Sequence, residues 1–427
     1  MIAMMRTVLG DRRGVVAIIF ALALPVTAGV AGLGVEAGEW YMLKRRAQTA
    51  ADAAAYAGAL EIARSARAQA RPVALGESAR NGYPNGSPIT VTVNIPPVSG
   101  PQAGNANAVE VLVAQQQPLR FASLFIPGPQ TITARAVASV NQLGNACVLA
   151  LDRTARRAFQ TTGNSVVQMN ECSLASNSSD AESMYFSGSS QVSAPTAWSA
   201  GGIVQSGSST PQFPGGTLAF AWPVQDPYAG LTITMPAAPA CNNPRALTFN
   251  STTLSPGVYC GGINVNSGST VVLNPGTYYL DQGDFSVGSN AVVTCACTAA
   301  GSGVTIVLTS SRAASRIGSV TINGQARVTL RAPSSSSYPY PGILFFQDRR
   351  YSGNTVNHLN GGSNLQLTGA MYFPSSSVDW NGNSTGLGCT QIIADTVTIS
   401  GDTNLTNTGC AALGLQPISL TFAGLTE

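Results

Sequence analysis

The sequence predicts a mixed fold with a long N-terminal membrane-spanning α-helix, a small α/β unit and a large all-β C-terminal domain. Three observations predict it. Residues 14–35 are apolar or small, residues 39–72 are rich in good helix formers, and short β-branched runs recur after Cys147 with Asn, Gly or Ser between them. Regular short strands with small polar turns favour a parallel β-helix, and a β-sandwich or jelly roll is the alternative.

The apolar run has the length of a bilayer span. Its 22 residues would extend roughly 33 Å as a helix, close to the roughly 30 Å hydrocarbon core of a membrane. A secretory signal usually has a shorter apolar region, of about 7–15 residues, before a small-x-small cleavage site. Ala21–Ala23 has that form but lies inside the run, and cleavage near residues 28–31 is the alternative. We expect residues 14–36 to stay as a transmembrane helix.

Charge predicts the orientation of this helix. Arg12 and Arg13 directly precede it, whereas Glu36 and Glu39 follow it. Basic residues close to a span stay on the cytoplasmic side, and the basic residues 44–46 lie further away. We therefore expect a single-pass membrane protein, with residues 1–13 as a cytoplasmic tail and the bulk of the chain on the outer side of the membrane.

Cysteine usage agrees with that orientation. All eight cysteines lie after residue 140 in a lysine-free region, which is typical of disulfides in an oxidising compartment. Residues some 20–25 apart in a β-solenoid return to the same edge one coil later, so sequence order suggests pairing between neighbours. Two free thiols are the alternative for the closest pair. The predicted pairs are Cys147–Cys172, Cys241–Cys260, Cys295–Cys297 and Cys389–Cys410.

Composition excludes several classes of function. The first 72 residues hold nine basic and five acidic side chains, and the other 355 hold 13 and 14. The positive charge therefore belongs to the membrane-proximal helix, and no basic stripe is left for nucleic acid. His358 is the only histidine, which argues against a His-based catalytic triad or a multi-His metal site. We expect no cofactor and no metal.

Sugar cleavage is the enzymatic activity to consider for a predicted β-helix. The nearest candidates are Asp379 beside Trp380, and Asp395 with Asp402, because paired carboxylates cleave glycosidic bonds. Acids at turns more often bond the backbone. We therefore expect no catalytic residues and no enzyme.

The stretch after the span continues as helix. Residues 37–72 contain no proline before Pro72, so we expect this stretch and the span to form one helix of 50-odd residues that Pro72 stops. Residues 73–142 then predict a small pilin-like α/β unit, with period-two strands at 89–95 and 108–115. Residues 118–125 are a short helix candidate, a third strand follows, and residues 143–427 are the solenoid-like domain.

Small residues repeat along the first helix at helix-packing spacing. Gly34 and Gly38 form G-x-x-x-G, and Ala28 with Gly32 forms a small-x-x-x-small pair. Such spacing lets helix backbones approach closely in lipid. Glu36 lies at the membrane edge, where an acid is either solvated or paired with a partner's cation. We predict helix–helix assembly through these five residues.

This N-terminal segment resembles that of TadE/TadG-like proteins of the tight-adherence (Flp) pilus assembly system. The resemblance rests on Arg12-Arg13-Gly14, on Pro25 within the apolar run, on Gly32-x-x-Val35-Glu36-x-Gly38-x-x-Tyr41, and on the alanine-rich Gln48–Ala55. Pilin-like members that a prepilin peptidase cuts carry Glu five residues after the cleaved Gly. Ile19 stands at that position here, which argues against processing as a pilin.

The resemblance implies a non-enzymatic, membrane-anchored component of a tight-adherence-type pilus assembly or secretion apparatus. It also implies that the span lies in the bacterial inner membrane, with the bulk of the chain periplasmic or extracellular. The partners of this component would be the lipid bilayer and pilus-assembly membrane proteins that contact the N-terminal helix. The alternative is a membrane-tethered surface adhesin whose β-rich domain binds a cell-surface glycan or a neighbouring cell. An anchored polysaccharide-degrading enzyme is the weakest reading.

Overall fold

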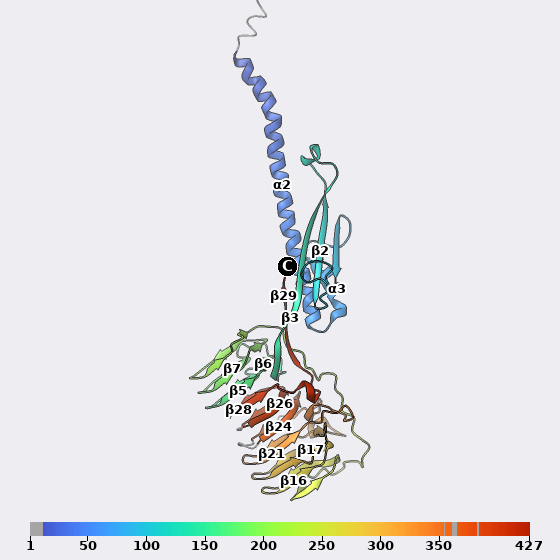
Figure 1. The fold of residues 1–427 in the computed structure, drawn as a ribbon, viewed down its shortest axis with the longest axis vertical. Coiled ribbons are helices and arrows are strands. Elements are labelled where there is room, and N and C mark those ends of the chain that lie inside the picture. The colour runs from blue at the N-terminus through green and yellow to red at the C-terminus, as the bar shows by residue number, and fades with distance from the viewer. Residues whose placement is uncertain (1–11, 354, 361–364, 382–383) are drawn as a thin grey trace, which may run out of the picture. The chain divides into compact units, whose positions relative to one another are not determined.

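The computed structural model describes residues 12–353, 355–360, 365–381 and 384–427 (Figure 1). The chain forms two compact units: a first unit up to Asn141 that also includes Thr421–Glu427, and a second unit, Gln142–Leu420. The predicted solenoid domain 143–427 is therefore too long at its end. Its last residues return to the first unit because Thr426 N donates to Val137 O at 2.8 Å. Most of the predicted cytoplasmic tail, residues 1–13, lies outside the described residues.

The first helix ends before Pro72. Helix α2 spans Arg12–Ala63, and a second helix, α3, spans Arg67–Arg80 with Pro72 inside it. Ser65 adopts a left-handed conformation (φ 59°), and Ala66 N donates to Glu61 O at 2.8 Å. These are the marks of a Schellman C-cap, which closes the helix with local backbone hydrogen bonds. The prediction of one helix that Pro72 stops is thus wrong: capping at Ser65 ends α2, and the chain folds back.

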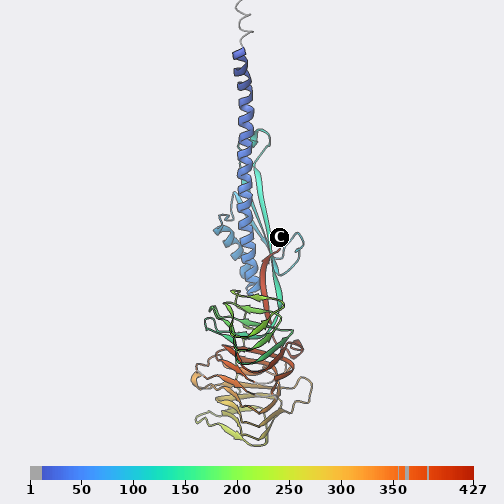
Figure 2. The same ribbon diagram turned by 90° about the vertical axis from the view of Figure 1, so that its left-hand side faces the viewer.

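An antiparallel sheet accompanies these helices. It consists of β1 (Ile89–Asn94), β2 (Ala108–Gln117) and the N-terminal part of β3 (Gln130–Ala150). The alanine face of α2, from Ala47 to Ala59, is buried with valines of this sheet in one core. The predicted helix at 118–125 is only a 3-10 turn, η1 (Ala122–Leu124), at the apex of the β2–β3 hairpin. Figures 1 and 2 show this hairpin beside α2.

The second unit is a parallel β-helix, so the sandwich alternative is wrong (Figure 2). The sequence Asn323-Gly324, a hairpin signal, instead joins strands of different ladders within one coil; Gly382 of the second such signal lies outside the described residues. The coils stack three strand ladders. The first ladder runs through β12 (Thr217–Leu218), β9 (Ala197–Ser199), β6 (Ser173–Ser176), β3, β26 (Ser384–Ala394), β24 (Leu365–Phe373), β22 (Ile343–Gln347), β19 (Val304–Thr309), β17 (Gly276–Val287) and β15 (Gly257–Val265).

The other two ladders use the same coils. The second contains β10 (Ile203–Gln205), β7 (Met184–Phe186), β4 (Phe159–Thr161), β27 (Val397–Ile399), β25 (Val378–Trp380), β23 (Asn357–Leu359), β20 (Val320–Ile322), β17, β15 and β13 (Leu247–Phe249). The third contains β11 (Thr210–Gln212), β8 (Gln191–Ser193), β5 (Val166–Asn170), β28 (Thr403–Thr406) and β26, then β24, β21 (Arg327–Arg331), β18 (Val292–Cys295), β16 (Thr270–Leu273) and β14 (Thr252–Leu254). Outside the ladders lie η2 (Ala314–Arg316), η4 (Ala411–Leu413) and β29 (Ile418–Leu425).

The coils do not stack in chain order. The coil of β3, β4 and β5 pairs on one side with β6, β7 and β8, the next coil in sequence. On its other side it pairs with β26, β27 and β28, which close the solenoid about 240 residues later in the chain. The chain therefore enters the stack in its middle, runs to β12 at one end, restarts at β13 at the other end, and returns coil by coil to the middle.

A connecting segment, residues 219–246, joins the two ends of the stack (Figure 1). It has no regular secondary structure, and it lies against several coils in turn. Side-chain and backbone contacts hold it there, with a disulfide near its end. Its attachment points are Asn177–Val224, Asp226–Tyr372 and Cys241–Cys260.

The solenoid core consists of stacked side chains from successive coils. Phe345 packs between Phe285 and Phe373, with ring centroids 5.9 and 6.2 Å apart. Glycines shape one of the turns: Gly163 and Gly188 both have positive φ, and a Cβ atom at Gly188 would lie 2.4 Å from Gly163 O. Small residues between short strands are thus needed because neighbouring coils approach within backbone contact.

Candidate functional site

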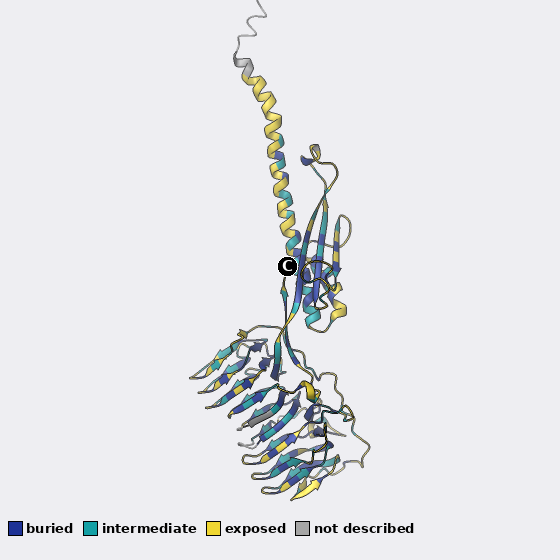
Figure 3. Ribbon diagram, in the orientation of Figure 1, coloured by how far each residue is buried: buried dark blue, intermediate teal, exposed yellow. Residues whose placement is uncertain are grey.

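The predicted assembly residues lie on two different faces of α2. Each residue turns the helix by about 100°, so Gly32 and Glu36 share one face while Gly34 and Gly38 share the opposite one. Gly32 and Glu36 are buried, and Gly34 and Gly38 are exposed. A Cβ atom added at Gly34 or Gly38 would meet no described atom within 4 Å outside its own helix. Ala28, which lies on the side of Gly32, is also exposed. Figure 3 shows most of the N-terminal part of α2 as exposed.

The buried face meets the apex of the β2–β3 hairpin. A Cβ atom at Gly32 would lie 2.5 Å from Cδ1 of Phe121. The aromatic ring therefore occupies the space that the missing side chain leaves. Gly32 does allow a close approach to the helix backbone, as its spacing predicts, but the approaching group belongs to the same chain.

Glu36 binds the same hairpin apex. Arg120 N donates to Oε1 of Glu36 at 2.8 Å, and Ala122 N donates to Oε2 at 2.7 Å. The Arg120 side chain also lies 3.3 Å from Glu39. Neither sequence-based expectation for Glu36 matches this arrangement, because the carboxylate is not solvated and its partners are backbone N–H groups of its own chain.

The residues of the hairpin apex are not among the predicted assembly residues. Phe121, Phe125 and Ile126 are all exposed there, although Phe121 also contacts Gly32. A signal was available, since hairpin loops are usually polar and PLRFASLFIP between two strands is mostly apolar. The amphipathic pattern suggested a helix instead, so the contact with α2 was not foreseen.

A buried carboxylate fixes the other end of this hairpin. Glu110 on β2 accepts hydrogen bonds from Arg135 Nε at 2.7 Å, Asn94 Nδ2 at 2.8 Å, Ser99 Oγ at 2.8 Å and Val98 N at 3.1 Å. Burial by itself would raise the pKa of Glu110, but these hydrogen bonds outweigh it and lower the pKa to about 2. Glu110 therefore stays ionised and ties the three strands of the sheet together.

Gln48 and Lys44 attach the helix to β3. Gln48 Nε2 donates to Arg135 O at 2.8 Å, and Lys44 donates to Thr133 O. The alanine-rich stretch that follows Gln48 is buried against the sheet of the same unit. The open part of the helix is thus its N-terminal portion, where Gly34 and Gly38 lie.

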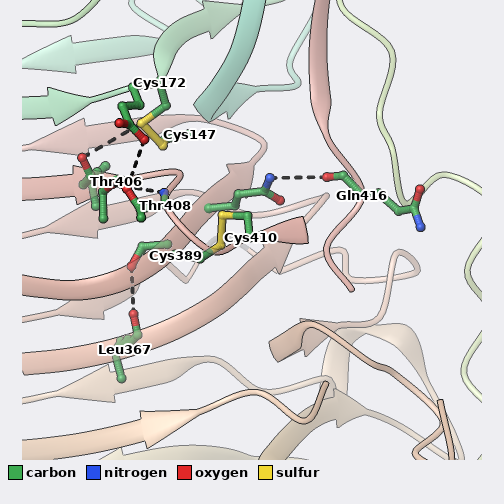
Figure 4. The surroundings of a disulfide bond; sticks show 12 residues. Cys147, Cys172, Leu367, Cys389, Thr406, Thr408, Cys410 and Gln416 are labelled. Atoms are coloured by element: carbon green, nitrogen blue, oxygen red, sulfur yellow. Dashed lines mark hydrogen bonds between the residues drawn. A yellow bond between two sulfur atoms is a disulfide. The ribbon is translucent and has the colours of Figure 1, made fainter. Parts of the chain in front are cut away.

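The structure joins the eight cysteines in sequence order. Cys147–Cys172 links neighbouring coils, and Cys389–Cys410 lies close by in the adjoining coil, as Figure 4 shows. Both disulfides therefore lie where the chain enters and leaves the stack. The remaining pairs are Cys241–Cys260, which attaches the connecting segment, and Cys295–Cys297 within one strand end.

The candidate residues for sugar cleavage contact neighbouring coils or lie in the core. Trp380 is buried in the core, so its ring cannot stack on a sugar. Asp379 lies 3.5 Å from His358 on the neighbouring coil. Asp402 accepts a hydrogen bond from Val166 N at 2.8 Å, a backbone contact between coils. In the part of the chain that the structure describes, no three His, Cys, Asp or Glu side chains are placed to hold a metal ion.

Asp395 directly follows β26, and Asp152 lies two residues after β3 in the adjoining coil, where Asp152 N donates to Asp395 O at 2.9 Å. Burial, with a smaller contribution from Asp152, raises the pKa of Asp395. These two coils are the ones that chain order would not bring together. A like-charged pair therefore lies at the join of the two halves of the solenoid.

Comparison with known proteins agrees with the N-terminal part of this picture. Helix α2 is long and apolar enough to cross a membrane, by length and composition. Residues 14–69 match the family described as Flp pilus-assembly TadE/G-like. That match covers α2 from its third residue, the turn after it and the start of α3. No curated protein and no solved structure matches the chain.

Proposed function

We propose that this protein is a non-enzymatic, membrane-anchored component of a tight-adherence-type pilus assembly or secretion apparatus. The observation that carries the proposal is the overlap of the family match, residues 14–69, with the one helix among the described residues that is long and apolar enough to span a membrane. The family indicates the pilus system, and the helix supplies the anchor. The specific role follows from which surfaces of that helix its own chain leaves open.

The face of α2 that contains Gly34 and Gly38 is the part that a partner helix can approach. Glycines four residues apart let two helix backbones come close in lipid, where packing and hydrogen bonds replace the hydrophobic effect. Gly32 and Glu36 are already engaged by Phe121 and the backbone of the hairpin apex. We therefore infer that pilus-assembly membrane proteins contact the Gly34–Gly38 face.

The topology belongs to the same proposal. The helix is retained in the bacterial inner membrane with its N-terminus cytoplasmic, supported by Arg12 and Arg13 before the span and Glu36 and Glu39 after it. The disulfides support an oxidising compartment for the β-helix. We accordingly place the β-helix on the periplasmic or outer side.

The test is fractionation with affinity capture from pilus-positive and pilus-negative cells. We expect the intact chain in the inner membrane and pilus-machinery proteins captured only from pilus-positive cells. Mass spectrometry should find residues 14–35 in the mature chain. A mature N-terminus between residues 24 and 32, or capture of the same proteins from both cell types, would contradict the proposal.

An adhesin is the second candidate, and one surface of the β-helix favours it. Phe220 is 75% exposed and lies with Trp222 and Arg153 around a hollow of about 400 Å³. Backbone hydrogen bonds from Phe220 N to Gly201 O and from Ala221 N to Ser199 O hold this stretch on a coil. Aromatic rings beside a charged side chain suit a glycan, whose rings offer apolar faces and hydroxyls.

Glycan binding by the purified full-length protein separates the two functions. An adhesin should bind a subset of an arrayed glycan panel and lose that binding on Phe220→Ala. An assembly component should bind none of them. A degradation screen on the same panel tests the absence of enzymatic activity, since release of reducing sugar by the intact protein would contradict it.

A further inference from the structure

The apex of the β2–β3 hairpin, residues 118–129, exposes apolar side chains. The exposed fractions are 69% for Phe125, 46% for Phe121 and 40% for Ile126. An apolar cluster on an exposed hairpin tip has no role in the core of this unit, which lies at the alanine face of α2. Such an exposed apolar cluster indicates a surface that contacts lipid or another molecule.

The contacts of the apex set its level along α2. Phe121 lies against Gly32, which precedes Glu36 by one helical turn within the apolar run 14–36. At 1.5 Å per residue, Gly32 is roughly 6 Å nearer the middle of the span than Glu36. Two hydrogen bonds to Glu36 hold the apex there. Because the apex is bound to the end of the apolar run, it lies in the interfacial layer when that run is in the membrane.

The backbone of the apex suits that location. Backbone polar groups that reach the hydrocarbon must be satisfied within the protein, because no water is there to bond them. Arg120 N and Ala122 N donate to Glu36, and Phe125 N and Ile126 N both donate to Ala122 O at 2.9 Å. The donors therefore point inward and the apolar side chains outward. The charged end of Arg120 lies near Glu39, further along α2 in the direction away from the span.

We propose that the hairpin apex is a second membrane contact: Phe121, Phe125 and Ile126 insert into the interfacial layer of the leaflet from which α2 emerges. The proposal rests on the membrane anchoring in the proposed function. The occupant is phospholipid, because the apex is held directly on the membrane-spanning segment and is continuous with its apolar surface. Aromatic and aliphatic side chains bind this layer in proportion to the apolar area that they bury. The helix and the apex together would fix the angle at which the first unit leaves the membrane.

Depth-dependent fluorescence quenching tests the contact. The full-length protein is reconstituted into phosphatidylethanolamine–phosphatidylglycerol vesicles with or without brominated acyl chains. The variants are Phe125→Trp at the apex, Val30→Trp in the span, and Val98→Trp as the matched control. Val98 is 72% exposed and lies in the loop at the opposite end of β2, about 30 Å from the apex along the strand. The unmodified chain measures the background of its four native tryptophans.

We expect bromolipid to quench the added indole of Phe125→Trp several-fold more than that of Val98→Trp, and aqueous acrylamide to show the reverse. Equal quenching of these two variants overturns the proposal. Shielding of Phe125→Trp from both quenchers also overturns it, since a second copy of the chain would then cover the apex. The Val30→Trp variant tests the membrane span separately. If bromolipid quenches it, the span is supported whatever the result at the apex; if bromolipid does not quench it, the span itself is refuted.

Discussion

Phe121 lies against Gly32 so closely that a single added carbon at position 32 would be 2.5 Å from its ring. Gly34, two residues further along the same helix, faces open space. A contact within the chain and an open helix surface thus lie on opposite faces of α2. The two glycines can therefore be separated by experiment.

Leucine at these two glycines should act differently. Gly32→Leu is expected to push Phe121 away and to increase hydrogen exchange of residues 119–126, because the ring has no room beside a larger side chain. Gly34→Leu should leave that exchange unchanged and weaken cross-linking to membrane partners, because it separates helix backbones in lipid. Reduced cross-linking with Gly32→Leu but not with Gly34→Leu would contradict the proposal, because the partner would then contact the face that contains Gly32.

Glu36→Gln should loosen the hairpin apex while leaving the protein in the membrane. The carboxylate accepts two backbone hydrogen bonds, and bonds to a charged group contribute about 1.5–3 kcal/mol each. We expect faster exchange of the amide protons of Arg120 and Ala122 in vesicles. The matched variant Glu39→Gln removes only the exposed ion pair with Arg120 and should have little effect on either proton. Equal effects of both variants would show that general charge near the membrane matters, and not the two hydrogen bonds.

The lowered pKa of Glu110 predicts that acid destabilises the first unit. Its pKa falls from the ordinary 4.5 to about 2 on folding, so the unfolded chain binds the proton more readily. The stabilisation is complete above pH 4.5 and is lost as the pH falls towards 2. We expect the protection factors of β1 and β2 amides, which are exchange rates corrected for the intrinsic effect of pH, to fall over that window. Glu110→Gln should already have lower protection factors at pH 7 and should change less between pH 5 and 2. Parallel pH profiles for both proteins would exclude Glu110 as the cause.

Disulfide mapping and removal test the order of the coils. Peptide mapping without reduction should recover Cys147 with Cys172 and Cys389 with Cys410. A peptide that joins Cys147 to Cys389 or Cys410 would be incompatible with the observed stack.

Replacement of Cys241 and Cys260 by serine should destabilise the β-helix by roughly 3 kcal/mol, a value typical for a loop of this size. The bridge closes a loop with a sequence separation of 19. The matched double serine variant at Cys295 and Cys297 should cost less, because their separation of 2 restricts the unfolded chain little. Denaturant unfolding of the full-length protein in detergent measures both. A larger loss for the closely spaced pair would contradict this account.

Substitutions of two acids where the two halves of the solenoid meet should change the melting temperature in opposite directions. The pKa of Asp395 is raised by burial and by Asp152, so its ionisation opposes folding, and the stability present at acid pH is lost as pH rises through the raised pKa. Asp395→Asn should therefore raise the melting temperature at pH 7 and have no effect below pH 3.8, the ordinary pKa. Asp402→Ala removes an acceptor for Val166 N and should lower the melting temperature. Destabilisation by both substitutions at pH 7 would refute the role of charge at this join.

Much of the architecture could be read from local patterns. The span needs only a run of apolar residues, and the β-helix needs only short strands separated by small turn residues, as around Gly163 and Gly188. Both patterns lie within stretches of consecutive residues, so propensity and periodicity reveal them. The end of α2 could not be read in this way, because the left-handed residue that caps it is Ser65 and not the glycine or asparagine that usually marks a helix C-cap. Pro72, the expected stop, is accommodated inside α3.

That a long helix precedes a β-helix follows from the order of residues alone, because hydrophobic length and strand spacing are local properties. Which coils are neighbours, and which face of the helix is open, follow only from the folded chain. Ala150 pairs with Ala394, and Glu36 binds the backbone of residues 120 and 122. Such contacts join distant parts of the chain, and the choice among alternative coil orders or helix faces depends on packing of the whole unit. No stretch of neighbouring residues contains that information.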